Sequence, residues 1–158
     1  MTPRWPGRQE IRALLRHLPA LQRPAERLCR VHTAAERPGP DGQALTMPWV
    51  EYGPEVTAFF SDVSRLGFVQ VFDWPSWRQR AELAADPRKL AAADLTDIVK
   101  LLTAHTRAER FVDGHWYELL RSGHLVAVLQ RLAEIDALAD TDPTAGHLLE
   151  DREGLARR

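Results

Sequence analysis

The sequence predicts a mainly α-helical protein, a compact orthogonal bundle of about six helices with one small extended or hairpin element. Apolar residues recur at helical spacing in four stripes, at positions 11–18, 56–66, 95–106 and 125–135. A segment rich in aromatic and β-favouring residues, 45–52, interrupts this pattern. Each stripe needs a partner to bury its apolar face, so we expect the four stripes to form one core.

The length and composition of the chain suit a single domain. With 158 residues, of which 44% are hydrophobic and 27% charged, the chain can bury about 70% of the surface that it exposes when unfolded. We expect a loose N-terminal tail over residues 1–7, one helical domain over 8–138, and a charged, frayed C-terminal tail over 139–158.

The charge and cysteine content exclude several classes of protein. A net charge of −1 favours neither nucleic acid nor an anionic membrane, so we expect no nucleic-acid binding without a local basic patch. The single cysteine, Cys29, excludes an intramolecular disulfide and a zinc site built on several thiolates. With no signal-peptide pattern and no apolar run of about 18 residues, we expect a cytoplasmic protein without a membrane span.

Two short helices are predicted at the start of the domain. Apolar residues at helical spacing predict a helix from Arg8 that Pro19 stops or kinks. Pro24 suits the first turn of the next helix, in which Cys29 and His32 would share a face.

A loop and a strand are predicted next. The turn residues within 36–43 predict an exposed loop, and the segment 45–52 predicts an extended or edge strand. Residues 31–33 are positioned to pair with it in a small hairpin. Pro54 then begins a strongly amphipathic helix, which Gly67 ends as a left-handed C-terminal residue.

The middle of the chain is predicted to hold a strand, a helix and a linker. Residues 68–72 alternate in the manner of a strand. Pro75 restricts the residue before it and can begin a helix that runs through Ala85. Residues 88–93 are expected to form a short linker.

The last third is the most strongly helical. Asp94 is a good N-cap, and Asp97 three residues later completes a variant of the capping box. Asp113 is expected to cap the following helix, which Gly123 ends. The stripe at 125–135 predicts the final helix.

A cationic strip is the first candidate binding site. Its members lie opposite the apolar face of the predicted central helix and fall within about 80° of one another on a helical wheel. They are Lys100, Thr103, Arg107 and Arg110. Guanidinium groups bind carboxylates and phosphates through two parallel hydrogen bonds, which predicts a site for an acidic partner or a small anion. The alternative is a solvated helix face whose charges pair locally, such as Asp97 with Lys100.

The Asp73–Trp77 turn is the second candidate. Asp73 lies among Phe72, Trp74 and Trp77 at a predicted strand-to-helix junction. The acid could line a pocket or pair with an arginine of the central helix. In the alternative interpretation, Asp73 caps its helix and both tryptophans fill the core.

Histidines and acids gather near the end of the central helix. The group consists of His105, Asp113, His115, Glu118 and His124. These residue types serve metal and acid–base sites, but their spacing matches no metal-binding motif, so we predict no metal site. We expect His105 to be a core histidine and keep Asp113 and His115 as ligand- or partner-binding candidates. No phosphate-binding glycine loop or nucleophile-elbow serine is present, and we predict no cofactor.

Four segments in a fixed order carry a family resemblance: MPWVEYGPEV, FDWPSW, LLTAHTRAERFVDG and SGHLVAVL. Over roughly residues 8–138 they resemble the bacterial family grouped as domain of unknown function 6508. The resemblance implies a compact bacterial domain and transfers no catalytic residue, because the family brings no established activity. The shared motifs contain Asp73, Trp74, Arg107, Arg110, Phe111 and Gly114.

Three functional hypotheses follow. The preferred one is a non-catalytic interaction module that holds an unknown acidic protein or small anion on the cationic strip, with the Asp73–Trp77 turn as a neighbouring wall. The alternative is a small hydrolase or nucleotide-processing enzyme in which Asp73, Asp113 or His115 acts as acid or base, which requires these groups to share one cleft with the arginines. Nucleic-acid binding through the strip is a third hypothesis that the near-neutral charge disfavours. The oligomeric state stays open.

Overall fold

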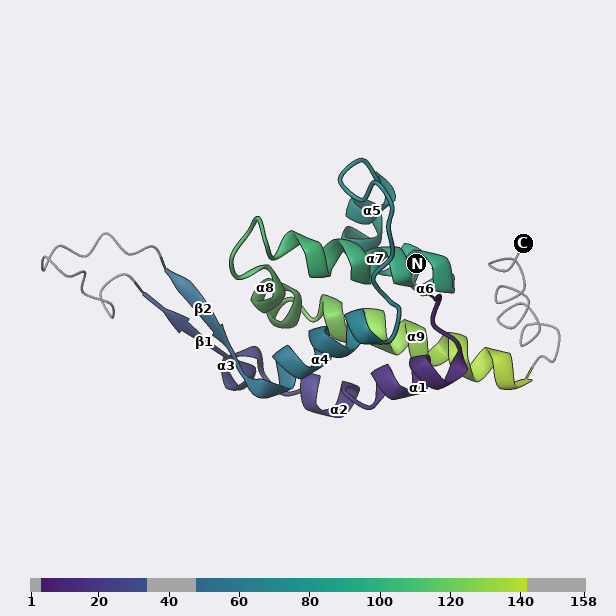
Figure 1. The fold of residues 1–158 in the computed structure, drawn as a ribbon, viewed down its shortest axis with the longest axis horizontal. Coiled ribbons are helices and arrows are strands. Elements are labelled where there is room, and N and C mark those ends of the chain that lie inside the picture. Colours follow the sequence, from purple (N-terminus) through teal and green to yellow (C-terminus); the bar gives the residue numbers. More distant parts are fainter. Residues whose placement is uncertain (1–3, 34–47, 142–158) are drawn as a thin grey trace, which may run out of the picture.

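A computed structural model describes residues 4–33 and 48–141, and it consists of a helical bundle from which one hairpin projects (Figure 1). The helices are α1 (Arg8–Leu15), α2 (Leu18–Leu21), α3 (Ala25–Leu28), α4 (Pro54–Arg65), α5 (Gln79–Ala85), α6 (Pro87–Ala91), α7 (Leu95–Ala108), α8 (His115–Arg121) and α9 (His124–Thr141). The strands are β1 (Cys29–His32) and β2 (Trp49–Tyr52). The prediction of a mainly α fold with a small hairpin is therefore confirmed. The loop predicted at 36–43 and the chain beyond Thr141 lie outside the described residues.

α7 is the most deeply buried helix and contacts α4, α8 and α9. Its start has the predicted capping box, in which the Asp97 amide donates to Asp94 Oδ1 at 2.8 Å and the Asp94 amide donates to Asp97 Oδ2 at 3.3 Å. Burial extends beyond the predicted stripe and includes Leu95, Ile98, Val99, Leu101, Leu102, Thr103, Ala104, His105 and Ala108. The remainder of the fold therefore surrounds α7 instead of covering one side of it.

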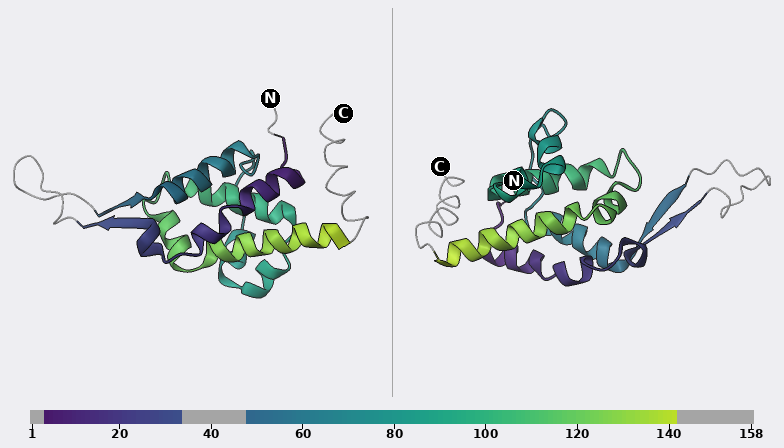
Figure 2. Two further views of the ribbon diagram at one scale, coloured as in Figure 1. Left: turned by 90° about the horizontal axis from the view of Figure 1, so that it is seen from below. Right: turned by 180° about the vertical axis from the view of Figure 1, so that it is seen from behind.

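α9 runs along the bundle and lies beside α1 in all the views of Figures 1 and 2. Their apolar faces join in the core, and a group of ion pairs crosses the outer edge of the contact. The Arg12 guanidinium donates to Asp136 at 3.1 Å and to Asp140 at 3.0 Å. Arg8 pairs with the same two carboxylates. The first and last helices of the described chain are thus fastened together.

The first three helices follow the proline pattern. Pro19 lies in the first turn of α2, where a missing amide costs nothing, and Pro24 immediately precedes α3. The expectation that Cys29 and His32 share a helix face is wrong, because α3 ends at Leu28 and both residues lie on β1. Residues three apart on a strand point to opposite faces, so these two side chains are separated.

The predicted hairpin is confirmed. β1 and β2 pair in antiparallel fashion with the register Cys29↔Tyr52, Arg30↔Glu51, Val31↔Val50 and His32↔Trp49. The His32 and Trp49 rings stack with their centroids 4.1 Å apart. Tyr52, at the other end of β2, contacts the Trp116 ring of α8. An isolated two-stranded hairpin is marginally stable, so its contact with α8 is needed to hold it.

α4 ends as predicted, with Gly67 in the left-handed conformation at φ 86°. The strand expected at 68–72 is wrong: this segment has no strand partner in the described chain, and its backbone bonds to α7 instead. The Thr103 hydroxyl lies 3.0 Å from the carbonyl oxygen of Phe68 and accepts a hydrogen bond from the Gln70 amide at 3.0 Å.

The segment between the Asp73–Trp77 turn and α7 differs from the prediction in two ways. Residues 74–77 form a turn in which the Trp77 amide donates to the carbonyl of Trp74 at 3.3 Å, and α5 begins only at Gln79. The expected linker at 88–93 is largely helical, because Asp86 caps α6 by accepting a hydrogen bond from the Arg88 amide at 2.9 Å.

Candidate interaction site

The cationic strip predicted on α7 is not continuous. Thr103 is fully buried, because the segment 68–72 lies over this part of the helix and bonds to the Thr103 hydroxyl. The expectation that Thr103 faces solvent between Lys100 and Arg107 is therefore wrong. Helical spacing places Thr103 opposite the apolar stripe. Its burial comes from a tertiary contact, which helical spacing does not predict.

Lys100 fastens the turn at 72–77 to α7. Its Nζ atom lies 5.5 Å from the ring centroid of Phe72 and 5.8 Å from that of Trp77, within the range of cation–π attraction. The two rings pack edge to face at 5.9 Å. Lys100 and Trp77 thus have a structural contact in this turn.

The two arginines at the end of the strip are available to a partner. α7 ends at Ala108, with Arg107 half-buried on its last turn and Arg110 exposed in the loop that follows. Within residues 4–33 and 48–141, neither guanidinium forms a side-chain hydrogen bond or an ion pair. Both groups keep their full capacity to bind a carboxylate.

Trp74 joins the turn to the loop that follows α7. Its ring centroid lies 6.1 Å from that of Phe111, and the Arg80 guanidinium carbon lies 5.5 Å from the Trp74 ring. Phe111 and Val112 are 77% and 58% exposed, and Val71, just before the turn, is 84% exposed. We name this surface the aromatic–arginine patch, consisting of Trp74, Arg80, Arg107, Arg110, Phe111 and Val112.

Asp73 and Asp113 are both exposed and flank the patch in sequence. In the described part of the chain, Asp73 forms no ion pair with an arginine, and it does not cap α5, whose N-cap is Arg78. The expectation that Asp113 caps α8 is also wrong, because the N-cap is Gly114 at φ 83°. A glycine N-cap has no side-chain acceptor, so another residue must bind the free amides at the start of α8.

Glu109 provides that acceptor, and no sequence pattern predicts this role. Its carboxylate accepts hydrogen bonds from the Trp116 amide at 2.8 Å, the Gly114 amide at 3.2 Å and the Tyr52 hydroxyl at 2.6 Å. Burial, followed by the hydrogen bond to Glu109, raises the pKa of Tyr52. One carboxylate therefore caps α8 and anchors β2, and local spacing rules do not describe a cap that reaches back over a loop.

Three histidines meet where α7, α8 and α9 converge, and we name them the histidine chain: His105, His115 and His124. His105 Nδ1 lies 3.0 Å from His115 Nε2, and His105 Nε2 lies 3.1 Å from His124 Nε2. His105 is 4% exposed, which confirms the prediction of a core histidine. His115, expected as a ligand group, instead bonds inward, and His124 was not among the predicted site residues.

Burial lowers the pKa of each ring in the histidine chain, because desolvation disfavours the charged imidazolium. The neighbouring rings lower the pKa of His105 further, and the Arg80 guanidinium lowers the pKa of both His105 and His115. In residues 4–33 and 48–141, no group of three or more histidine, cysteine or acidic side chains is arranged to hold a metal ion. His105 directs its two ring nitrogens at different neighbours, so the three rings do not face one point.

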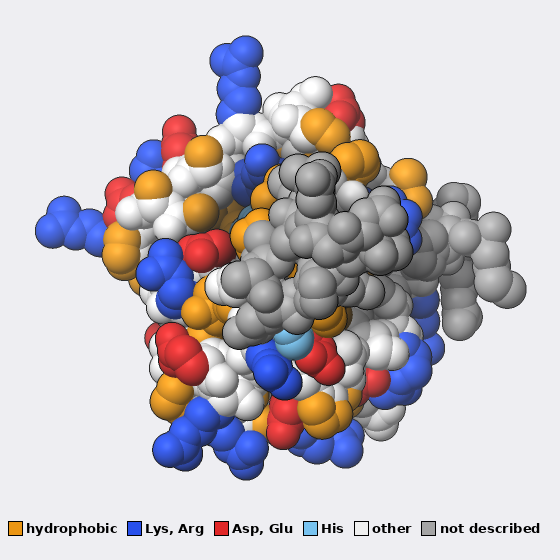
Figure 3. Space-filling model, turned by 90° about the vertical axis from the view of Figure 1, so that its left-hand side faces the viewer, with side chains coloured by type: hydrophobic (Ala, Val, Ile, Leu, Met, Phe, Trp, Pro, Cys, Tyr) orange, Lys and Arg blue, Asp and Glu red, His pale blue; other side chains and the backbone are white. Residues whose placement is uncertain are grey.

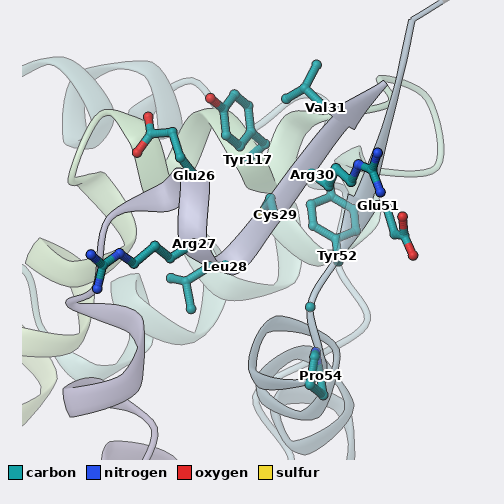
Figure 4. A pocket seen from close by; sticks show the side chains of 11 residues that line it. Glu26, Arg27, Leu28, Cys29, Arg30, Val31, Glu51, Tyr52, Pro54 and Tyr117 are labelled. Carbon is teal, nitrogen blue, oxygen red and sulfur yellow. The ribbon is translucent and has the colours of Figure 1, made fainter. Parts of the chain in front are cut away.

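A separate hollow of about 670 Å³ lies at the base of the hairpin, between α3, β1, β2 and α8 (Figure 4). Arg27 and Arg30 point in opposite directions along it, so their guanidinium groups do not converge on one anion (Figure 4). Cys29 contributes to the wall, and burial raises the pKa of its thiol to about 11. The thiol is protonated at neutral pH and is a poor nucleophile.

The end of the molecule that carries the hairpin exposes hydrophobic side chains between basic and acidic ones (Figure 3). Charges of both signs alternate over this face, and no broad region of one sign is visible on it.

Comparison with known proteins identifies the family. Of the helices that the structure describes, none has the length and apolar character needed to cross a membrane. Searches of curated proteins and of solved structures give no significant match. A family model, described as a family of unknown function, matches residues 6–137 and thus most of the chain. The protein therefore belongs to the DUF6508 family.

Proposed function

We propose that the protein is a non-catalytic, cytoplasmic interaction module that binds an acidic segment of a partner protein on the aromatic–arginine patch. The contact between Trp74 and the largely exposed Phe111 carries this proposal, because Phe111 directly follows Arg110 in the chain, and neither Arg110 nor Arg107 has a side-chain partner in the described residues. Aromatic residues and arginine are the types enriched in protein–protein interfaces.

The chemistry of the patch favours a partner protein over a small anion. Arg107 and Arg110 can each bind a carboxylate through two parallel hydrogen bonds. A small anion would leave Phe111 and Val112 exposed, whereas an acidic segment with apolar side chains would cover them. The expected partner is therefore a peptide segment in which acidic and apolar residues are mixed.

The patch is held in place before binding. Lys100 fixes the turn at 72–77 through cation–π contacts, and Arg80 lies over the Trp74 ring. A surface that is already ordered loses little conformational entropy on binding, which favours affinity. The cytoplasmic location rests on the sequence, whose single cysteine is typical of a reducing compartment.

A defined peptide tests the proposal. We would titrate the protein with a synthetic peptide that alternates glutamate and leucine, and follow backbone amide signals by NMR. The expected shifts centre on residues 71–77 and 107–112. Arg107→Ala combined with Arg110→Ala should weaken binding at least tenfold, and Phe111→Ala should weaken it severalfold while leaving the Tm near that of the wild type.

A matched control removes the same charge elsewhere. Arg65→Ala combined with Arg121→Ala deletes two exposed arginines that pair locally with Asp62 and Glu118. This control should keep wild-type affinity. Equal loss in both double variants, a fall of several degrees in the Tm of the Arg107/Arg110 variant, or tighter binding of an RNA oligonucleotide than of the peptide would each contradict the proposal.

A further inference from the structure

Hydrogen bonding limits the number of protons that the histidine chain can hold. A neutral imidazole has one N–H and one acceptor nitrogen. The central ring, His105, therefore donates to one neighbour and accepts from the other when all three rings are neutral. Both short contacts are then hydrogen bonds, and both run in the same direction along the chain.

This geometry accommodates one additional proton but not two. With a single imidazolium in the chain, each contact can still contain one donor and one acceptor. If both outer rings are charged, each presents an N–H to His105, which has only one lone pair while it is neutral. If His105 and a neighbour are charged, two N–H groups face each other. A second proton must therefore break one contact.

The charged groups around the chain decide which contact breaks. Arg80, from α5, disfavours a charge on His105 and on His115, whereas the Glu109 carboxylate at the end of α7 favours a charge on His115. His105 is the most buried of the rings, so the protons go to the outer two. With Glu109 stabilising its charge, His115 is the ring that leaves His105.

The contact between His105 and His115 closes the loop of residues 109–114. The loop begins where α7 ends and returns to helix at His115, the first residue of α8. The Glu109 carboxylate also fastens it by binding amides at the start of α8, and the Trp116 indole N–H donates to the His105 carbonyl at 3.0 Å. Arg110 and Phe111 lie within this loop, and both are exposed. Loss of the histidine contact removes the one of these fastenings that depends on imidazole protonation.

We propose that the histidine chain is a proton-operated latch, which holds the loop of residues 109–114 closed at neutral pH and releases it when the chain takes up a second proton. Because Arg110 and Phe111 belong to the aromatic–arginine patch, release of the loop also disperses the patch and weakens peptide binding in mild acid. This last link rests on the proposed function.

The latch is tested by NMR titration of the full-length protein between pH 8 and pH 5. Ring signals of His105, His115 and His124 should change together with the amide signals of residues 110–113, with a Hill coefficient above 1. His115→Gln replaces the ring by an amide that can bond His105 whether it is neutral or charged. In this variant the loop signals should stay constant over the same range.

His32→Gln is the matched control, because His32 lies on the hairpin and pairs with Glu51 outside the chain. Its loop transition should equal that of the wild type. Loop signals that do not move in the wild type, that follow a single proton independently of the three rings, or that move equally in His115→Gln would overturn the latch. The wild-type titration decides the matter even if a variant does not fold. Peptide binding at pH 7.5 is measured separately and tests the proposed function alone. Absence of binding at this pH would contradict the proposed function but not the latch.

Discussion

Tyr52 of β2 donates a hydrogen bond of 2.6 Å to Glu109, which lies beyond the end of α7 and also caps α8. This single contact ties the hairpin to the helical bundle at the point where α7 gives way to the loop of the patch. It also gives the half-buried phenol its partner, and a buried hydroxyl without one is costly.

Tyr52→Phe should lower the free energy of unfolding by about 1.5–2 kcal/mol, because it removes a hydrogen bond to a charged group. Urea unfolding at pH 7.5 measures the change. Tyr117→Phe is the control, since the Tyr117 hydroxyl borders the open hollow, and it should cost less than about 0.5 kcal/mol. Equal losses in the two variants would show that the bond to Glu109 is not what holds the hairpin.

The stability of the protein should fall as the pH drops below about 6.5. Each ring of the histidine chain has a folded-state pKa below that of the unfolded chain, so its contribution is complete above the unfolded value and is lost in acid. Each fully excluded proton contributes a slope of about 1.4 kcal/mol per pH unit, so three rings give a slope of at most about 4 kcal/mol per pH unit. Urea unfolding at pH 8, 7, 6 and 5 measures this slope.

His124→Gln removes one of these titrating groups and should reduce the slope by up to about 1.4 kcal/mol per pH unit. If the wild type and this variant had the same dependence on pH, another group would have to account for the loss in acid.

The N-cap of α7 gives a third prediction. Asp94→Ala should destabilise the fold by about 1 kcal/mol, because the Asp97 amide loses its side-chain acceptor, whereas the backbone amide of residue 94 can still donate to Asp97. Asp94→Ser retains an acceptor and should recover most of the loss. Asp73→Ala, at an exposed acid with no ion pair in the described chain, should change the Tm by less than about 1 °C.

Two glycines provide a fourth prediction. Gly67 and Gly123 both have positive φ, so alanine at either site costs about 1–2 kcal/mol in backbone strain. A Cβ at Gly67 would also come within 2.3 Å of the Arg4 carbonyl oxygen, whereas one at Gly123 meets no atom within 4 Å. Gly67→Ala should therefore be the more destabilising by at least about 1 kcal/mol in thermal unfolding. Equal losses would mean that residues 4–7 do not pack firmly on the end of α4.

The sequence predicts the elements whose signals are local. The start of α7 follows from Asp94 and Asp97, the end of α4 from Gly67, and the hairpin from β-favouring residues on both strands. The strand predicted at 68–72 is wrong because alternation is only a local pattern. A strand also needs a neighbouring strand to pair with.

The site was harder to predict than the fold. Thr103 lies on the expected polar face of α7 and is buried only because the segment at 68–72 covers it. The histidine chain joins residues that are 10 and 19 positions apart in the sequence, and no helical or strand period relates them. Their meeting depends on how three helix ends converge, which side-chain spacing does not encode.

The ion pairs between α1 and α9 have a consequence for how the protein is made. Arg12 reaches carboxylates that are 124 and 128 residues later in the chain. On the ribosome, α1 emerges before α9, so the side of α1 that packs on α9 stays uncovered until α9 has been synthesised. The core can close only once α9 has left the exit tunnel, so completion of the native state is a late step in folding.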